Sequence, residues 1–190
     1  MTGLSSRIFL SIVLLPLAAL AQAPDAAALI DAQREAMKAF ARMDGLWRGP
    51  AWTVLPGGAK HHVTQTERIG LLLDGSIRLI EGRSYDAEGR SGFNAFGVIA
   101  YDPAKKSYTL RSHAQGRYGE FAIQPTEDGY TWEIPAGPMT IRYTATIKDG
   151  TLTEVGDRIA PGKEPVRFFE MRLTRLGDSA WPGAGAVAPK

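Results

Sequence analysis

The chain of 190 residues contains no cysteine. The absence of cysteine excludes a disulfide framework, a thiol nucleophile and a thiolate metal site, and it also excludes a lipid anchor attached through cysteine at a signal-peptide junction. The fold must therefore be held together by packing, and a chain of this length can bury a sufficient core.

The chain also has little net charge, because 22 Lys and Arg residues are balanced by 20 Asp and Glu residues. It contains no block of basic residues, so the charge pattern favours neither a nucleic-acid partner nor an anionic membrane surface. With 44% hydrophobic and 22% charged residues, the composition is that of one globular domain.

Catalytic signatures are missing as well. The sequence has no Gly-x-Ser-x-Gly elbow, no His-Glu-x-x-His motif and no phosphate-cradling glycine loop. Its only histidines are His61, His62 and His113. His61 and His62 would face opposite sides of a strand and cannot bind one metal together, and a site of one histidine with Glu67 has no further support. We predict no catalytic residue, no metal and no cofactor, so a non-enzymatic role is expected over an enzyme.

Residues 1–21 have the three parts of a secretory signal peptide. Arg7 gives a positive start, an apolar stretch follows, and Ala19-Leu20-Ala21 is a small-x-small cleavage site. The apolar stretch is too short to cross about 30 Å of hydrocarbon comfortably. We predict cleavage after Ala21, which gives an exported protein, periplasmic or secreted, with no membrane span in its mature form. Cleavage after Ala23 is the alternative, but it would place a proline next to the cut.

One helix is predicted within residues 22–44, ahead of the main domain. Asp25 can cap its N-terminus, residues 26–43 are rich in helix formers, and Gly45 can end it. Its apolar residues recur at helical spacing: Leu29, Ala32, Ala36, Phe40 and Met43. We expect this stripe to plug one end of the main domain. The alternative is that the helix or the C-terminal tail docks on a partner.

After Gly45 the composition shifts to β-branched and aromatic residues, and turn signals recur about every ten residues, which is typical of an all-β sandwich or barrel. Segments of strand length lie between the turns, at residues 46–55, 60–73, 76–85, 92–101, 107–114, 118–124, 130–134, 139–148, 151–159 and 166–176. Hairpin-length connections predict an all-β fold, an up-and-down antiparallel barrel of about ten strands over residues 45–176. Residues 177–190 have no periodicity and are predicted to be a flexible tail.

The sequence Gly-Leu-Trp-Arg-Gly at residues 45–49 resembles the start of calycin and nitrobindin-type barrels. With the Pro-Gly-Gly turn at residues 56–58 and Gly-x-x-x-Tyr-Asp-Pro at residues 97–103, the chain more closely resembles an uncharacterised bacterial family of domains of unknown function with a lipocalin-like fold. This resemblance covers roughly residues 44–176 and implies a fold but no established activity. Nitrobindin-type barrels bind haem through a histidine near the C-terminal strands. Residues 139–176 contain no histidine, which argues against haem.

The calycin resemblance also implies how the barrel closes. In calycins the tryptophan of the Gly-x-Trp motif seals one end, and an arginine from the last strand stacks across its indole. Here the closing residues would be Gly45, Trp47 and Arg175, which shares its side of the strand with Phe169, Met171 and Leu173. Arg172, on the opposite side, is the alternative partner.

A barrel of this size can hold one small ligand, and such sites are mostly apolar with a few convergent polar groups. Glu81, Arg83 and Tyr85 share one face of their strand with Ile77 and Leu79. If that face points inward, Glu81 and Arg83 pair inside the cavity. If not, they lie at an exposed strand end, which is favoured because Glu and Arg are seldom buried.

Other candidates lie on later strands. His113 and Arg111 are ligand contacts if they point inward, and incidental if they lie outside with Thr109. The aromatic residues could stack on a flat or acyl ligand. Together the candidate ligand-binding residues are Glu81, Arg83, Tyr85, Phe96, Tyr101, Arg111, His113, Trp132 and Tyr143.

The predicted function is non-enzymatic binding of a small apolar ligand in the barrel cavity, with no nucleic-acid partner. One alternative is a periplasmic isomerase or hydrolase that uses polar residues inside the barrel, with Glu81, Arg83 and His113 as its candidates. The other alternative is the interaction module described above. The sequence carries no signal for an oligomeric state.

Overall fold

The computed structural model describes residues 25–179, which begin with a capped helix. The Ala27 amide donates a hydrogen bond to the Asp25 carboxylate, as expected of an N-cap. The helix α1 (Ala26–Met37) then tightens into the 3-10 helix η1 (Lys38–Met43), so the α-helix is shorter than predicted. No helix within residues 25–179 is long and apolar enough to cross a membrane. The predicted signal peptide and residues 180–190 of the predicted tail lie outside the described residues.

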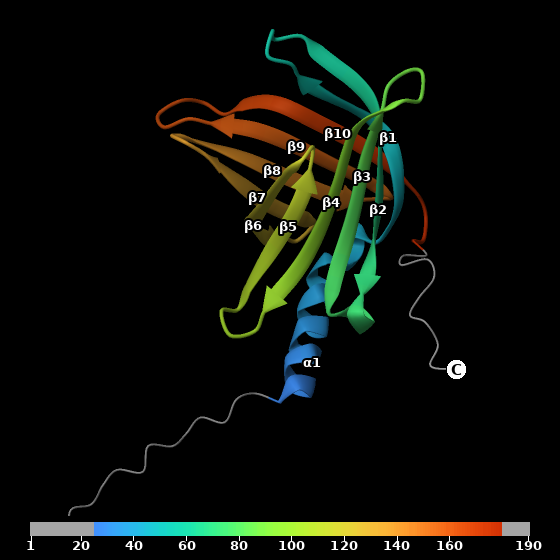
Figure 1. Ribbon diagram of the computed structural model, residues 1–190, viewed down its shortest axis with the longest axis vertical. Coiled ribbons are helices and arrows are strands. Elements are labelled where there is room, and N and C mark those ends of the chain that lie inside the picture. Colours follow the sequence, from blue (N-terminus) through green and yellow to red (C-terminus); the bar gives the residue numbers. More distant parts are fainter. Residues whose placement is uncertain (1–24, 180–190) are drawn as a thin grey trace, which may run out of the picture.

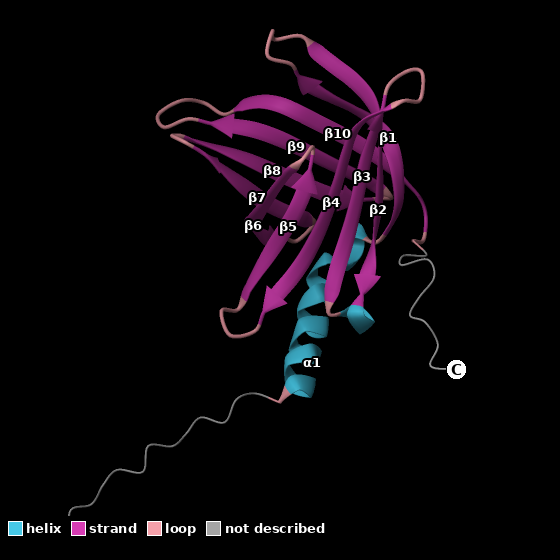
Figure 2. Cartoon of the chain, viewed as in Figure 1, coloured by secondary structure: helices cyan, strands magenta, loops and turns pink. Residues whose placement is uncertain are grey.

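Ten antiparallel strands follow, and they close into a barrel (Figure 1). The strands are β1 (Gly45–Val54), β2 (Lys60–Leu72), β3 (Ile77–Tyr85), β4 (Ser91–Asp102), β5 (Ser107–Ala114), β6 (Arg117–Pro125), β7 (Gly129–Ala136), β8 (Met139–Lys148), β9 (Thr151–Ile159) and β10 (Val166–Gly177). Each strand pairs with the next, a short 3-10 turn η2 (Leu73–Gly75) joins β2 to β3, and β10 returns to β1 (Figure 2). The predicted all-β, ten-stranded barrel is confirmed, with strand ends displaced by two residues at most.

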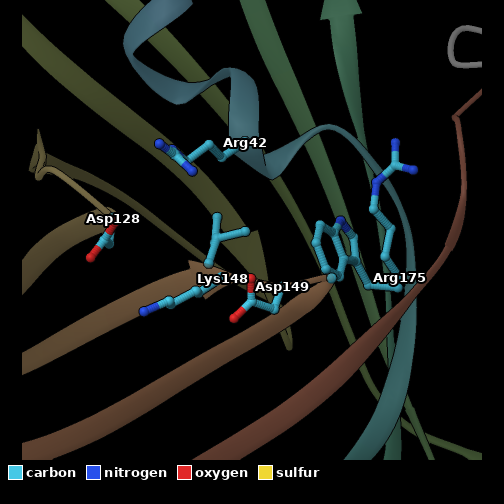
Figure 3. A pocket seen from close by; sticks show the side chains of 8 residues that line it. Arg42, Asp128, Lys148, Asp149 and Arg175 are labelled. Atoms are coloured by element: carbon cyan, nitrogen blue, oxygen red, sulfur yellow. The ribbon is translucent and has the colours of Figure 1, made fainter.

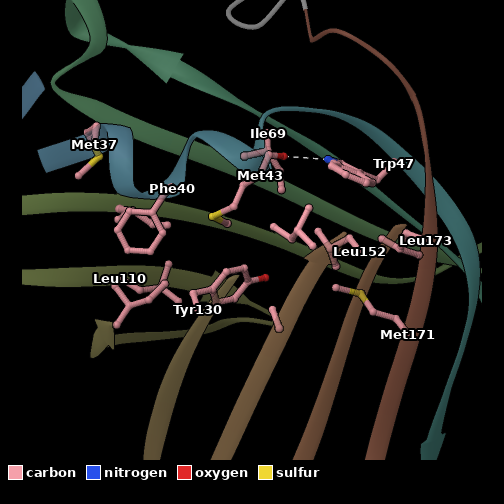
Figure 4. Close-up of a cluster of buried hydrophobic side chains, with 14 of the residues drawn as sticks. Met37, Phe40, Met43, Trp47, Ile69, Leu110, Tyr130, Leu152, Met171 and Leu173 are labelled. Carbon is pink, nitrogen blue, oxygen red and sulfur yellow. Dashed lines mark hydrogen bonds between the residues drawn. The ribbon is translucent and has the colours of Figure 1, made fainter. Parts of the chain in front are cut away.

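The end of α1 and the whole of η1 seal one end of the barrel. Met37, Phe40 and Met43 are buried in the core, where Figure 4 shows them beside side chains from the barrel wall. The Phe40 ring meets the Tyr108 ring edge-on at 5.1 Å, and the Tyr108 hydroxyl donates to the Ala36 carbonyl at 3.1 Å. The C-terminal half of the predicted apolar stripe therefore plugs the barrel, as expected.

A buried arginine fixes this plug to the wall. Arg78 on β3 is only 1% exposed, and its Nε and Nη2 donate to the two carboxylate oxygens of Asp44 at 2.7 and 2.9 Å. Its Nη1 donates to the Met37 carbonyl at 2.7 Å, at the end of α1. The bidentate pair with Asp44 and the third hydrogen bond to Met37 hold β3, the end of α1 and the residue just before β1 together.

The residues that the calycin resemblance assigned to barrel closure lie together at the same end. The Trp47 indole is buried, its Nε1 donates to the Met43 carbonyl at 2.8 Å, and Trp47 is the Cα partner of Arg175. The Arg175 guanidinium donates to the Asp44 carbonyl at 3.3 Å. Gly45 permits this approach, because a Cβ there would lie 2.9 Å from Arg175 Nε. Arg172 lies on the outer, exposed face.

Candidate functional site

The barrel interior differs between its two halves. Near the helix most inward-facing side chains are almost completely buried: Trp47, Ile69, Ile99, Ile123, Leu152 and Leu173. Toward the opposite end several inward-facing side chains keep accessible surface: Val63, Ala95, Phe121, Ile134, Ile141 and Phe169. In a closed barrel such side chains reach solvent only through the interior or its mouth. The half opposite the helix is therefore the accessible half, and we call it the open half.

An aromatic wall lines one side of the open half, formed by Phe121 on β6, Trp132 on β7, Tyr143 on β8 and Phe169 on β10. The Trp132 and Tyr143 rings are stacked, with centroids 4.3 Å apart and planes 9° apart. Phe121 lies 5.6 Å from Trp132, and Phe169 meets Tyr143 edge-on at 5.9 Å. Such a wall offers flat apolar surface to a ligand.

Two glutamates point into the same interior. Glu67 on β2 is the Cα partner of the buried Trp47, and Gln65 Nε2 donates to its carboxylate at 2.7 Å. Glu154 on β9 is 7% exposed and accepts two hydrogen bonds of 3.0 Å, from the Tyr130 hydroxyl and from Trp132 Nε1. The hydrogen bond from Trp132 links Glu154 directly to the aromatic wall.

Burial raises the pKa of Glu67 to about 8, because the charged form loses its hydration; the hydrogen bond from Gln65 opposes this rise, and the nearby Glu154 and Glu81 carboxylates add to it. Burial likewise raises the pKa of Glu154, against the hydrogen bonds from Trp132 and Tyr130. Within residues 25–179 neither carboxyl group has a basic side chain as an ion-pair partner. At neutral pH Glu67 is therefore largely protonated.

The next strand completes a polar wall, which we define as Gln65, Glu67 and Ser84. Ser84 on β3 is the Cα partner of Gln65 and is 6% exposed. Its hydroxyl has no hydrogen-bond partner in the part of the chain that the structure describes. Gly82, between Glu67 and β4, leaves space for the Glu67 carboxylate.

Three of the nine predicted ligand-binding residues point inward. Trp132 and Tyr143 belong to the aromatic wall, and burial raises the pKa of Tyr143 to about 12, with Glu154 adding to the rise and Arg158 opposing it. Tyr101 also points inward but lies at the helix end, where its ring is 4.8 Å from Tyr108 and packs on the core.

The expectation that Glu81, Arg83 and Tyr85 could face the cavity is wrong. On β3 the inward positions are those of Ile80, Gly82 and Ser84, so the alternating residues point outward. On the outer surface Glu81 accepts hydrogen bonds from Arg68 at 2.9 Å and from Arg83 at 3.1 Å. The exposed alternative, which the sequence favoured, is the one the structure has.

Phe96, Arg111 and His113 also point outward, contrary to their selection as cavity residues. Phe96 is the Cα partner of both Glu81 and His113, which places all three on the outer face. His113 packs against the Tyr118 ring at 5.0 Å, and Arg111 pairs with Glu120 at 2.7 Å. An enzyme that used Glu81, Arg83 or His113 inside the barrel thus loses its proposed site.

Sequence reasoning did not assign to the interior the polar residues that the structure brings together in this site: Gln65, Glu67, Ser84, Tyr130 and Glu154. A signal for the two glutamates existed. Glu67 stands two residues from the buried Ile69 and Glu154 two residues from the buried Leu152. Residues two apart in a strand share a face, so each glutamate interrupts a core-facing row.

A hollow lies at the helix end of the barrel, beside the closing residues (Figure 3). It has a volume of about 380 Å³ and is lined by Trp47, Ile147 and Gly150 together with Arg42, Lys148, Arg175, Asp128 and Asp149. Its charges have both signs, so it does not present a single-sign site for an ion. Among residues 25–179 no group of three or more His, Asp or Glu side chains could hold a metal.

No protein-family model matches the chain, and no curated protein matches it. The functional argument therefore depends on the open half of the barrel itself.

Proposed function

We propose that the protein binds a small molecule in the open half of the barrel. The observation that carries this proposal is the difference in burial between the two halves. Side chains at the helix end fill the interior, whereas inward-facing side chains such as Val63, Phe121 and Ile141 keep accessible surface. Small barrels can hold one small ligand, and the mouth of a β-barrel is a common place for a ligand site.

The two walls indicate the general shape of the ligand. The aromatic wall suits a flat apolar body, as expected from the sequence, while the polar wall and Glu154 require a polar end that a purely apolar molecule lacks. A molecule with one aromatic or acyl body and one polar end would match both walls.

The proposal can be tested with the neutral fluorescent dye N-phenyl-1-naphthylamine and a cavity-filling variant. Ser112 on β5 points inward between Gly97 and Gly119, its Cα partners on the neighbouring strands, so Ser112→Phe should occupy the open half and abolish dye binding. Thr109→Phe places the same side chain on the outer face of the same strand and is the matched control. Dye binding that survives Ser112→Phe, or that never occurs, would count against the proposal.

We propose as well that the chain is exported through residues 1–21 and that it is related to calycin-like barrels. The export proposal is supported by the charge and apolar pattern of those residues. The relationship is supported by the arrangement of Gly45, Trp47 and Arg175 at one barrel end. N-terminal sequencing of the protein from its native host should give Gln22 as the first residue; a retained Met1 would contradict export.

A further inference from the structure

We infer that the open half selects a small organic cation, an amine with an aromatic body, whose ammonium group lies against Glu67 and near Glu154. This inference rests on the proposed function, because it names the class of ligand that the open half would take.

The first argument concerns charge. Two carboxyl groups lie within one barrel interior, and no basic side chain among residues 25–179 pairs with either. Burying a carboxylate without a counter-charge is costly, which is why the free Glu67 holds its proton at neutral pH. A cation placed beside it removes most of that cost, so binding of the cation is accompanied by release of this proton. A cationic ligand therefore supplies the charge that the protein lacks at this position, whereas an anionic ligand would meet two acidic groups.

The second argument concerns hydrogen bonds and is independent of charge. The Ser84 hydroxyl is buried on the inner face and has no partner in the described part of the chain. Buried polar groups nearly always have a partner, so an orphaned one calls for a bound group. An ammonium has three donors and no acceptor. Ser84 Oγ and Glu67 Oε2, which accepts no hydrogen bond from the described residues, are acceptors available to it.

The third argument is the position of the aromatic wall. Trp132 Nε1 donates to the Glu154 carboxylate, so the Trp132 ring lies directly beside this acidic group. The stacked Trp132 and Tyr143 rings can then hold a flat body next to the ammonium, and aromatic faces also attract cations directly. The open half thus offers acidic and aromatic surface side by side, which is the complement of an aromatic amine.

The experiment compares three probes of nearly equal size: phenethylamine, its neutral counterpart 2-phenylethanol and the anionic 3-phenylpropionate. Each displaces N-phenyl-1-naphthylamine from the wild-type protein at neutral pH, or is titrated directly by calorimetry if the dye does not bind. We expect phenethylamine to bind about tenfold or more tightly than either of the other two, which corresponds to about 1.4 kcal/mol.

Glu67→Gln keeps the shape of the side chain but cannot release a proton to form a carboxylate beside a bound cation, so it should reduce this preference to less than about threefold. The matched control is Glu81→Gln, the same substitution on the outer face of the neighbouring strand, which should keep the full preference. Equal binding of the alcohol or the acid, no binding of any probe, or a preference that survives Glu67→Gln would each overturn the inference. If N-phenyl-1-naphthylamine still binds to the wild-type protein in any of these cases, the proposed function is not contradicted.

Discussion

Gly82 and the Glu67 carboxylate share one small space on the inner face of the barrel. A Cβ on residue 82 would lie 2.8 Å from Glu67 Oε1 and 3.0 Å from Oε2. The two residues are Cα partners on β2 and β3. The missing side chain at Gly82 therefore determines where the carboxyl group lies, within reach of the Gln65 amide.

The first prediction follows from this contact. In Gly82→Ala the new Cβ meets the end of a flexible side chain, so the barrel should persist while the Glu67 carboxylate moves and loses its hydrogen bond from Gln65. We expect phenethylamine to bind about five- to tenfold more weakly, as measured by dye displacement or calorimetry. Gly57→Ala, in a turn where a Cβ meets nothing within 4 Å, is the control. Unchanged binding in Gly82→Ala would show that Glu67 does not contact the probe.

The second prediction concerns the effect of pH on stability. The pKa of Glu67 is about 8 in the folded protein and 4.5 in an unfolded chain, so between these values the folded state holds a proton that the unfolded state has released. The contribution to stability is thus complete below pH 4.5 and is lost as the pH rises through 8. We expect Glu67→Gln to stabilise the protein at pH 9 relative to wild type by roughly 2–4 kcal/mol, with little difference at pH 4.5.

Urea unfolding at several pH values measures this effect. Glu81→Gln, on the outer face, keeps Glu67, so its stability should depend on pH in the same way as that of wild type. If wild type and Glu67→Gln respond to pH in parallel, then Glu67 does not carry the raised pKa. Burial also raises the pKa of Glu154, which adds loss of stability in the same direction in both proteins.

The third prediction concerns the buried guanidinium of Arg78. Arg78→Met keeps much of the volume but leaves the Met37 carbonyl without its donor and Asp44 without its counter-charge. Because the Asp44 side chain is about one-third exposed and can be hydrated, we expect a cost of about 2–3 kcal/mol in the free energy of unfolding. Arg83→Met removes a largely exposed arginine from the same strand and should cost less than about 1 kcal/mol. Similar costs would contradict the anchoring role of Arg78.

The sequence predicts most of this fold because its turns are explicit. Glycine-containing turns such as Asp149-Gly150 separate segments whose lengths suit single hairpins, and antiparallel neighbours need no long crossovers. The turns do not predict where the α-helix α1 changes into the 3-10 helix η1. That change places Phe40 and Met43 under the barrel, and it depends on contacts with distant strands.

The faces of the strands are harder to predict than their positions. β3 has apolar residues on both sides, Leu79 outside and Ile80 inside, so alternation alone does not tell which side is the interior. The inward position of Arg78 is explained only by Asp44 and Met37, which lie far away in sequence. A charged residue on the core-facing row therefore misleads any assignment based on local pattern.

Both glutamates could nevertheless have been found by following the hairpins. The turn after β1 pairs Trp47 with Glu67, and the Asp149-Gly150 turn pairs Ala145 with Glu154. Trp47 and Ala145 stand on apolar faces in the sequence, so their partners share those faces. Ser84 is harder to reach, because its assignment needs two successive registers, first from β1 to β2 and then from β2 to β3.

The fourth prediction concerns the indole of Trp47, which combines complete burial with a hydrogen bond to the Met43 carbonyl. Trp47→Ala should cost about 3–5 kcal/mol in the free energy of unfolding, because it opens a cavity between η1 and the barrel wall. Trp47→Phe keeps most of the apolar contact and should cost about 1–2 kcal/mol, since the Met43 carbonyl loses its donor. Trp52→Ala is the matched control, because Trp52 lies on the outer face of the same strand under Lys60; it should cost less than about 1 kcal/mol. If the two alanine variants unfold at the same urea concentration, Trp47 does not join the helical plug to the barrel.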